Sequence, residues 1–174
     1  KFLSGEKVEI EKQVLELQVY QANGEAIFIP ENTLSAEFLS KNITDNAVAI
    51  LPITGPLMKS DFCGSMGMQS MANVIRMLAD NEKVKSIVLN IDSPGGSVDG
   101  TVDVGAAVEY AKSKKNVIAY VDGLCASAAY RIAVNANSII AKQGSIIGSI
   151  GTMFQLVDDT EAQQKRGYKL ITIN

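Results

Sequence analysis

Short, mainly apolar runs recur from residue 46 onward, and this feature most limits the folds open to the chain. The runs are Ala47–Ile53, Val84–Ile91, Asn116–Val121 and Ser138–Ala141. Runs of this length and composition are expected of strands buried on both faces of a sheet. Apolar residues at helical spacing fill the intervening segments, which are Ser70–Ala79, Val98–Ser113 and Ala128–Val134. The alternation predicts an α/β fold with a largely parallel sheet and right-handed crossovers. A helix over Asp158–Arg166 and a strand over Lys169–Ile173 continue it.

Residues 1–45 lack this alternation, and we treat them as an N-terminal arm, separate from an α/β domain over residues 46–174. Val14–Tyr20 and Ala26–Pro30 flank Asn23-Gly24, a pattern that predicts a β-hairpin with a primed turn. A helix over Val8–Tyr20 is the alternative, because its apolar residues also fall near helical spacing.

Composition excludes several classes of partner. A formal net charge of −3 argues against nucleic acid, whose phosphates require a basic face. No apolar run approaches the ~18 residues of a membrane span. Cys63 and Cys125 lack metal-site spacing, and the 174 residues contain no histidine. We therefore expect free thiols and no metal, cofactor, nucleic acid or membrane span.

Ser127 lies among small residues, Cys125-Ala-Ser-Ala-Ala129, between a predicted strand and a predicted helix. A hydroxyl on such a bend is accessible to a substrate as a nucleophile, and the N–H groups of the following helix point toward an oxyanion formed there. The alternative is that Ser127 only caps the helix. Without histidine, the base must be a lysine, a carboxylate or a group from outside these residues. Cys125 has no partner base.

Two other strand ends carry glycine and serine, at residues 93–97 and 144–151. Functional sites of parallel sheets gather at the carboxyl ends of the strands. Gly95 and Gly96 expose backbone N–H groups, and one of them together with Ala128 N–H could form a two-donor oxyanion hole. Tight βα turns without any chemistry are the alternative for both segments.

Three motifs taken together resemble the SppA/protease IV family of Ser-Lys serine peptidases, in the Clp protease/crotonase fold group. They are Asn90-Ile-Asp-Ser-Pro-Gly-Gly96, Ala126-Ser-Ala-Ala-Tyr130 and Gly148-Ser-Ile-Gly151. The second motif and the N-terminal arm are most similar to the phage branch, the minor capsid and head-maturation proteases similar to protein C of phage lambda.

The resemblance implies a Ser-Lys dyad with Ser127 as nucleophile. It implies Gly95 or Gly96, with Ala128, as oxyanion donors, and Ser149 as a supporting residue. The family lysine follows a strand like Lys169–Ile173, so we expect it beyond Asn174. The domain over residues 46–174 is then truncated at its C-terminus, and the chain as given is a weak or inactive catalyst.

Other ionisable groups have plainer interpretations. Lys59 is interpreted as a solvated loop lysine, and Lys142 and Lys169 as edge or surface charges. Asp92 is expected to cap its turn and not to act as a base.

The predicted function is therefore a serine endopeptidase that cleaves extended, apolar or small-residue peptide segments. For a phage-type member the substrates are scaffold or capsid proteins, or segments resembling signal peptides. Its expected partners are peptide or protein substrates and further copies of itself, in the cytoplasm of a bacterial host or in a virion. Two alternatives remain open, an inactive assembly or scaffold protein on the same fold and a crotonase-like acyl-CoA enzyme.

Overall fold

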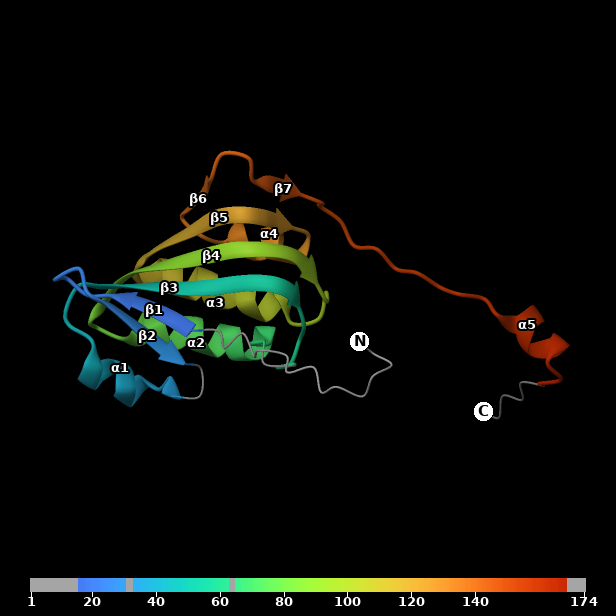
Figure 1. The fold of residues 1–174 in the computed structure, drawn as a ribbon, viewed down its shortest axis with the longest axis horizontal. Coiled ribbons are helices and arrows are strands. Elements are labelled where there is room, and N and C mark those ends of the chain that lie inside the picture. Colours follow the sequence, from blue (N-terminus) through green and yellow to red (C-terminus); the bar gives the residue numbers. More distant parts are fainter. Residues whose placement is uncertain (1–15, 31–32, 63–64, 169–174) are drawn as a thin grey trace, which may run out of the picture.

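The computed structural model describes residues 16–30, 33–62 and 65–168. Seven strands of these residues form one sheet in the order β2-β1-β3-β4-β5-β6, with β7 also paired to β5 (Figure 1). The strands are β1 (Glu16–Tyr20), β2 (Ala26–Pro30), β3 (Ala47–Leu57), β4 (Val84–Gly96), β5 (Asn116–Ala126), β6 (Ser138–Ala141) and β7 (Ile146–Gly148). All pairings from β3 to β7 are parallel. This confirms the predicted α/β class.

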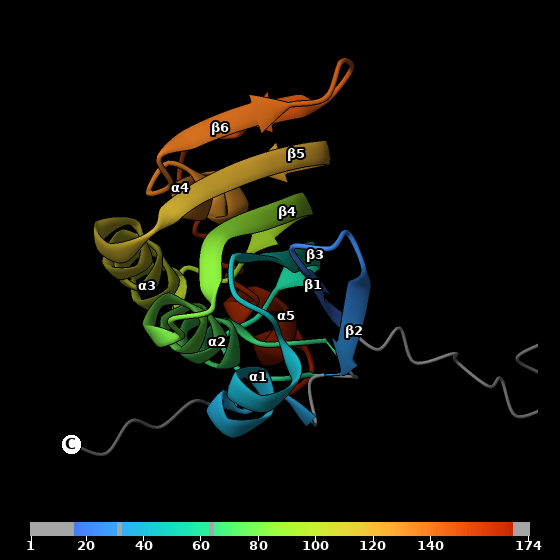
Figure 2. The same cartoon turned by 90° about the vertical axis from the view of Figure 1, so that its left-hand side faces the viewer.

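Three helices cover one face of the sheet, as the turned view in Figure 2 shows. They are α2 (Met68–Asp80), α3 (Thr101–Lys114) and α4 (Ala128–Ala133). The expectation that the central strands are buried on both faces is wrong. In β3, Ala47, Ala49 and Leu51 are buried while the residues between them are only partly covered. Since the described helices pack on one face only, every second residue enters the core.

The N-terminal segment forms the predicted hairpin as far as it is described. β1 pairs antiparallel with β2 and with β3, so the hairpin extends the sheet of the following domain. The prediction of a primed turn is wrong. Only Gly24 of the two turn residues has a positive φ, at 86°. Asn23 instead accepts the N–H of Glu25 at 3.0 Å and builds a longer turn from its side chain. The short helix α1 (Ala36–Asn42) follows, capped by Ser35.

The glycine motifs do not end their strands where the sequence predicts. β4 continues through Gly96, and Gly95 and Gly96 pair with Pro56 and Leu57 of β3. The pairing of β4 with β3 and its pairing with β5 both shift register next to Ser93. The exposed Pro94 is tolerated at such an irregularity because no backbone N–H is needed there for the sheet. Likewise Ile146–Gly148 is a strand and not only a loop. The motifs are therefore held rigidly by neighbouring strands.

The chain leaves the body after β7. Residues 149–159 run outward as an extended arm to the short helix α5 (Thr160–Lys165), as Figure 1 shows. The strand predicted over Lys169–Ile173 lies outside the described residues. Within the described part, none of the helices has the length and apolarity needed to span a membrane.

Candidate active site

Ser127 lies at the point where β5 ends and α4 begins, and its backbone is strained. Its φ is 54° and its ψ is −118°, a conformation that side-chain-bearing residues avoid. The flanking Ala126, Ala128 and Ala129 are buried, so only methyl groups pack around the bend. Ser127 itself is partly exposed. The bend therefore turns a half-buried hydroxyl outward from a closely packed frame, as a nucleophile requires.

The motif around residues 144–151 holds the bend in place. Ser127 N–H donates to the carbonyl oxygen of Gly148 at 3.0 Å, at the end of the parallel pairing between β5 and β7. Ser149 follows with a φ of 52°. Its side chain is exposed and makes no hydrogen bond within the described residues. A supporting role for the Ser149 hydroxyl stays a prediction, whereas the contribution of the Gly148 carbonyl is visible.

Gly95 lies against the same bend from the other side. A Cβ atom on residue 95 would be 2.6 Å from the carbonyl oxygen of Ala126, 2.7 Å from Ala128 N and 2.9 Å from the Cβ of Ser127. Its φ of 88° also favours glycine. Three sequence motifs far apart in the chain thus meet at Ser127, as the strand-end argument predicts.

The N–H groups available to an oxyanion differ between the two glycines. Gly95 N–H donates to the buried Ser93 Oγ at 3.1 Å, and that hydroxyl donates in turn to the carbonyl oxygen of Gly55 at 2.6 Å. Gly95 is therefore already engaged as a donor. Gly96 lines the cavity beside Ser127 together with Ala128, which favours Gly96 of the two glycines as the partner of Ala128 N–H.

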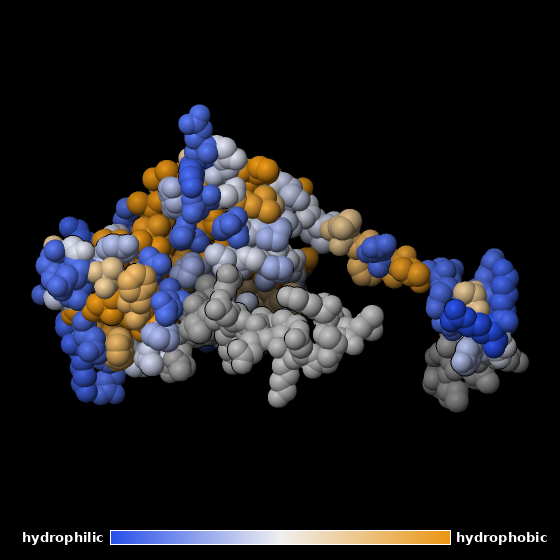
Figure 3. Space-filling view, viewed as in Figure 1, coloured by the Kyte–Doolittle hydropathy of each residue, from blue (hydrophilic) through white to orange (hydrophobic). Residues whose placement is uncertain are grey.

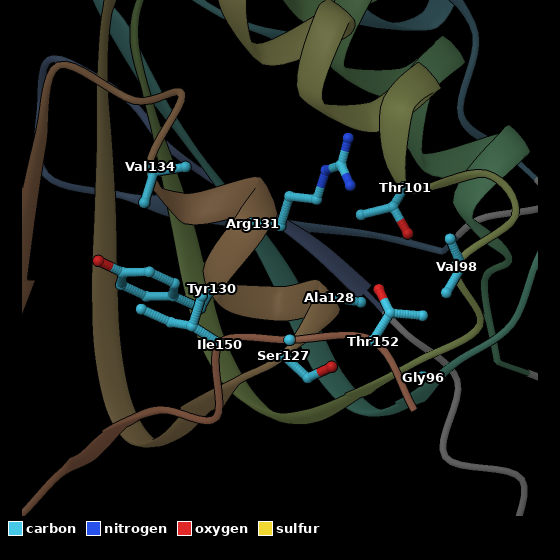
Figure 4. Close-up of a pocket in the computed structure, with 11 residues that line it drawn as sticks. Gly96, Val98, Thr101, Ser127, Ala128, Tyr130, Arg131, Val134, Ile150 and Thr152 are labelled. Carbon is cyan, nitrogen blue, oxygen red and sulfur yellow. The ribbon is translucent and has the colours of Figure 1, made fainter. Parts of the chain in front are cut away.

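A cavity of about 360 Å³ opens next to Ser127 (Figure 4). Its walls come from the end of β4, the start of α3, α4 and the first residues of the arm. The lining residues are Gly96, Val98, Thr101, Ser127, Ala128, Tyr130, Arg131, Val134, Ile150, Gly151 and Thr152. The lining is mostly apolar, so the cavity can take a side chain while the chain of a ligand passes Ser127.

Lys59 and Lys142 are engaged in ion pairs elsewhere. Lys59 Nζ pairs with Asp99 at 2.9 Å, and the hydrogen bond and charge of that carboxylate raise the pKa of Lys59. Lys142 Nζ pairs with Asp122 at 2.9 Å, and its pKa is raised for the same reasons. No lysine is among the described residues that line the cavity. Lys169 lies outside the described residues.

Asp92 and Cys125 have structural roles. Asp92 Oδ1 accepts the N–H of Leu124 at 2.9 Å, so it joins the ends of β4 and β5 as a turn-capping carboxylate does. Cys125 is fully buried, and this burial raises the pKa of its thiol. A buried thiol with a raised pKa is a poor nucleophile. The described part of the chain contains no cluster of three or more side chains suited to a metal ion.

Sequence reasoning missed two residues of this site. Ser93 belongs to a predicted motif, yet its hydrogen bonds to Gly55 of β3 and to Gly95 of its own strand depend on a register shift that no pattern reveals. Arg131 lies one helical turn after Ser127, and this spacing of four could have indicated a shared face.

The chain is similar to several known proteins. A family model described as the NfeD1b N-terminal domain matches residues 66–167. Protease 4 of Salmonella typhi is 33% identical over 120 residues, which cover 68% of this chain and 19% of that protein. Capsid assembly protease C of Escherichia phage lambda is 27% identical over 133 residues, 74% of this chain and 30% of that protein. The chain spans less than a third of either relative.

Solved structures share the fold at low identity. A membrane-bound stomatin-specific protease superimposes with a TM-score of 0.54 at 22% identity, over 67% of this chain and 54% of that chain. An enoyl-CoA hydratase/isomerase family member superimposes with a TM-score of 0.51 at 20% identity, over 60% of this chain and 48% of that chain. The Clp protease/crotonase fold expected from the motifs is confirmed.

Proposed function

The chain belongs to the NfeD1b N-terminal domain family and is similar to the SppA-like and phage capsid proteases, and from this premise we propose that it carries the nucleophile and peptide cleft of a Ser-Lys endopeptidase. The observation that supports this most directly is the strained backbone of Ser127 beside an apolar cavity. A helix cap needs no such strain, and here the Ser127 side chain makes no capping hydrogen bond.

The proposed chemistry is acyl transfer. Ser127 Oγ attacks the carbonyl carbon of the scissile peptide bond while its proton moves to a base. The N–H groups of Ala128 and Gly96 hold the oxyanion of the tetrahedral intermediate. The protonated base then returns the proton to the departing amine, an ester to Ser127 remains, and water hydrolyses this ester in the same manner.

For the base we propose the neutral amine of a lysine that lies outside the described residues. The ion pairs of Lys59 and Lys142 favour their charged forms, which cannot accept a proton. A dyad lysine requires a desolvated position that keeps the neutral form populated. Labelling of Ser127 should therefore accelerate as the pH rises through the pKa of that lysine.

Labelling with a fluorophosphonate tests the proposal. In a chain that also carries the proposed base lysine, we expect one adduct, mapped by mass spectrometry to Ser127, and none in Ser127→Ala. Ser113→Ala is the matched control, because this exposed serine lies remote from the cavity in α3. An unlabelled Ser127 in a chain that also carries the proposed base lysine would instead support the inactive scaffold protein. The acyl-CoA alternative has similarity of fold alone in its favour.

We further propose that the protein self-associates through its arm and acts on extended segments of assembly proteins, as the name of the lambda relative suggests for that protein. Hydrophobic residues follow one another along the arm in Figure 3. Each is at least 79% exposed: Ile150, Met153, Phe154, Leu156 and Val157. A patch of this kind marks an interaction surface. Sedimentation velocity should show smaller assemblies for Met153→Ser with Phe154→Ser than for the unaltered chain.

A further inference from the structure

Arg131 carries the single charge among the described residues that line the cavity beside Ser127. Its backbone N–H donates to the carbonyl oxygen of Ser127 at 3.0 Å, so it lies one helical turn beyond the proposed nucleophile. Figure 4 shows the side chain extending from α4 toward Thr101 across the cavity. Ser127 and Arg131 therefore border the same cavity.

Arg131 is exposed, and no protein acceptor among the described residues engages its guanidinium. Within the described residues, Arg131 takes part in none of the ion pairs, and its side chain makes no hydrogen bond. Thr101, toward which it extends, donates its own hydroxyl to the carbonyl oxygen of Ser97 at 2.9 Å. An arginine presents five N–H donors in a planar fork, and this fork matches a carboxylate in geometry and charge.

The remaining walls suit the aliphatic part of an acidic side chain. Val98, Val134 and Ile150 face the cavity and offer contact to methylene groups. A glutamate has two methylenes before its carboxylate, whereas an aspartate has one and reaches less far. A leucine would fill the same walls but leave the guanidinium without a partner.

We propose that Arg131 is a specificity-determining residue that selects glutamate as the residue supplying the scissile carbonyl. This inference rests on the proposed function, because it takes the cavity as the subsite next to the nucleophile. An ion pair between Arg131 and this carboxylate holds the acyl side of the substrate against Ser127. Removal of the charge should therefore weaken the binding of glutamate substrates more than that of uncharged ones.

Binding to the Ser127→Ala chain tests the inference without turnover. The probes are fluorescein-Ala-Ala-X-amide peptides with X as Glu, Gln, Leu or Lys, and the readout is fluorescence anisotropy. We expect the Glu peptide to bind about tenfold more tightly than the nearly isosteric Gln peptide. The difference should shrink at high salt, because the pair is partly exposed.

Three further variants in this background complete the design. Arg131→Gln should abolish the preference for Glu over Gln, and Arg131→Glu should transfer it to the Lys peptide. Arg76→Gln removes an equal charge from α2, outside the cavity lining, and should keep the preference. Equal binding of the Glu and Gln peptides, no binding of either, or a preference that survives Arg131→Gln overturns the inference.

The outcome is separable from that of the proposed function. A glutamate preference without fluorophosphonate labelling of Ser127 retains the role of Arg131 in binding and removes the peptidase. Labelling of Ser127 without a glutamate preference retains the peptidase and removes the role of Arg131.

Discussion

The Cα of Gly95 lies directly against the backbone nitrogen of Ala128, so that a Cβ atom on residue 95 would come within 2.7 Å of it. This contact brings a strand end of β4 to the N–H group proposed to bind an oxyanion. It also explains why the Ser127 bend is rigid, because the opposite side is held by the Gly148 carbonyl at 3.0 Å from Ser127 N. The hydroxyl is positioned by two backbone contacts from two different strands.

Gly95→Ala should therefore cost both stability and labelling. The added methyl meets three backbone or Cβ neighbours, and a φ of 88° strains any L-residue. We expect the free energy of unfolding to fall by about 3 kcal/mol, measured by urea titration, and fluorophosphonate labelling to be lost. Gly24→Ala is the control, because its φ of 86° is nearly the same and nothing lies within 4 Å of its Cβ position. It should cost only about 1 kcal/mol, and an equal loss in both variants would refute the close-contact argument.

An alanine variant is usually more stable than a glycine variant at the same position. At Ser127 we expect the opposite order, because glycine relieves the backbone strain. Ser127→Ala keeps a side chain at a φ of 54°, whereas Ser127→Gly releases it. We expect the glycine variant to be more stable by about 1 kcal/mol, and both to lose labelling. At Ser113, in α3, the alanine variant should be the more stable by about 1 kcal/mol, since glycine weakens a helix. Thermal unfolding of the four variants measures this, and a less stable Ser127→Gly would mean that the bend stores no strain.

Ser93 should matter more than an ordinary serine. Its buried hydroxyl connects the carbonyl oxygen of Gly55 with Gly95 N–H, at 2.6 Å and 3.1 Å. Ser93→Ala leaves the buried Gly95 N–H and the partly buried Gly55 carbonyl without this partner, so we expect a loss of about 1–3 kcal/mol in the free energy of unfolding. The exposed Ser113→Ala should change it by less than about 0.5 kcal/mol. A Ser93→Ala variant as stable as Ser113→Ala would show that the two backbone groups find other partners.

The sequence predicts a largely parallel sheet and the meeting of the strand-end motifs, because apolar runs and glycine positions depend on local chemistry. It does not predict that β4 continues through Pro94 to Gly96, because this requires a register shift created by neighbouring strands. For the same reason the sequence does not favour either Gly95 or Gly96 as the proposed oxyanion donor. The role of Ser93 becomes visible only when the turn at Gly55 is brought beside it. Arg131 carries a local signal, its spacing from Ser127, but its missing partner is a property of the folded cavity.

Burial of Cys125 should make stability depend on pH in the alkaline range. Burial raises the pKa of this thiol in the folded state, so the unfolded chain ionises it first. The stabilisation is fully present below about pH 8.5, the ordinary thiol pKa, and is lost as the pH rises through the raised value. In a Cys63→Ala background, the free energy of unfolding should decline more steeply above pH 8.5 than in the same background with Cys125→Ala. Ellman's reagent should also react with native Cys125 far more slowly than with the urea-unfolded chain. Equal rates in the two states would mean that the thiol is accessible, and the argument from burial would then fail.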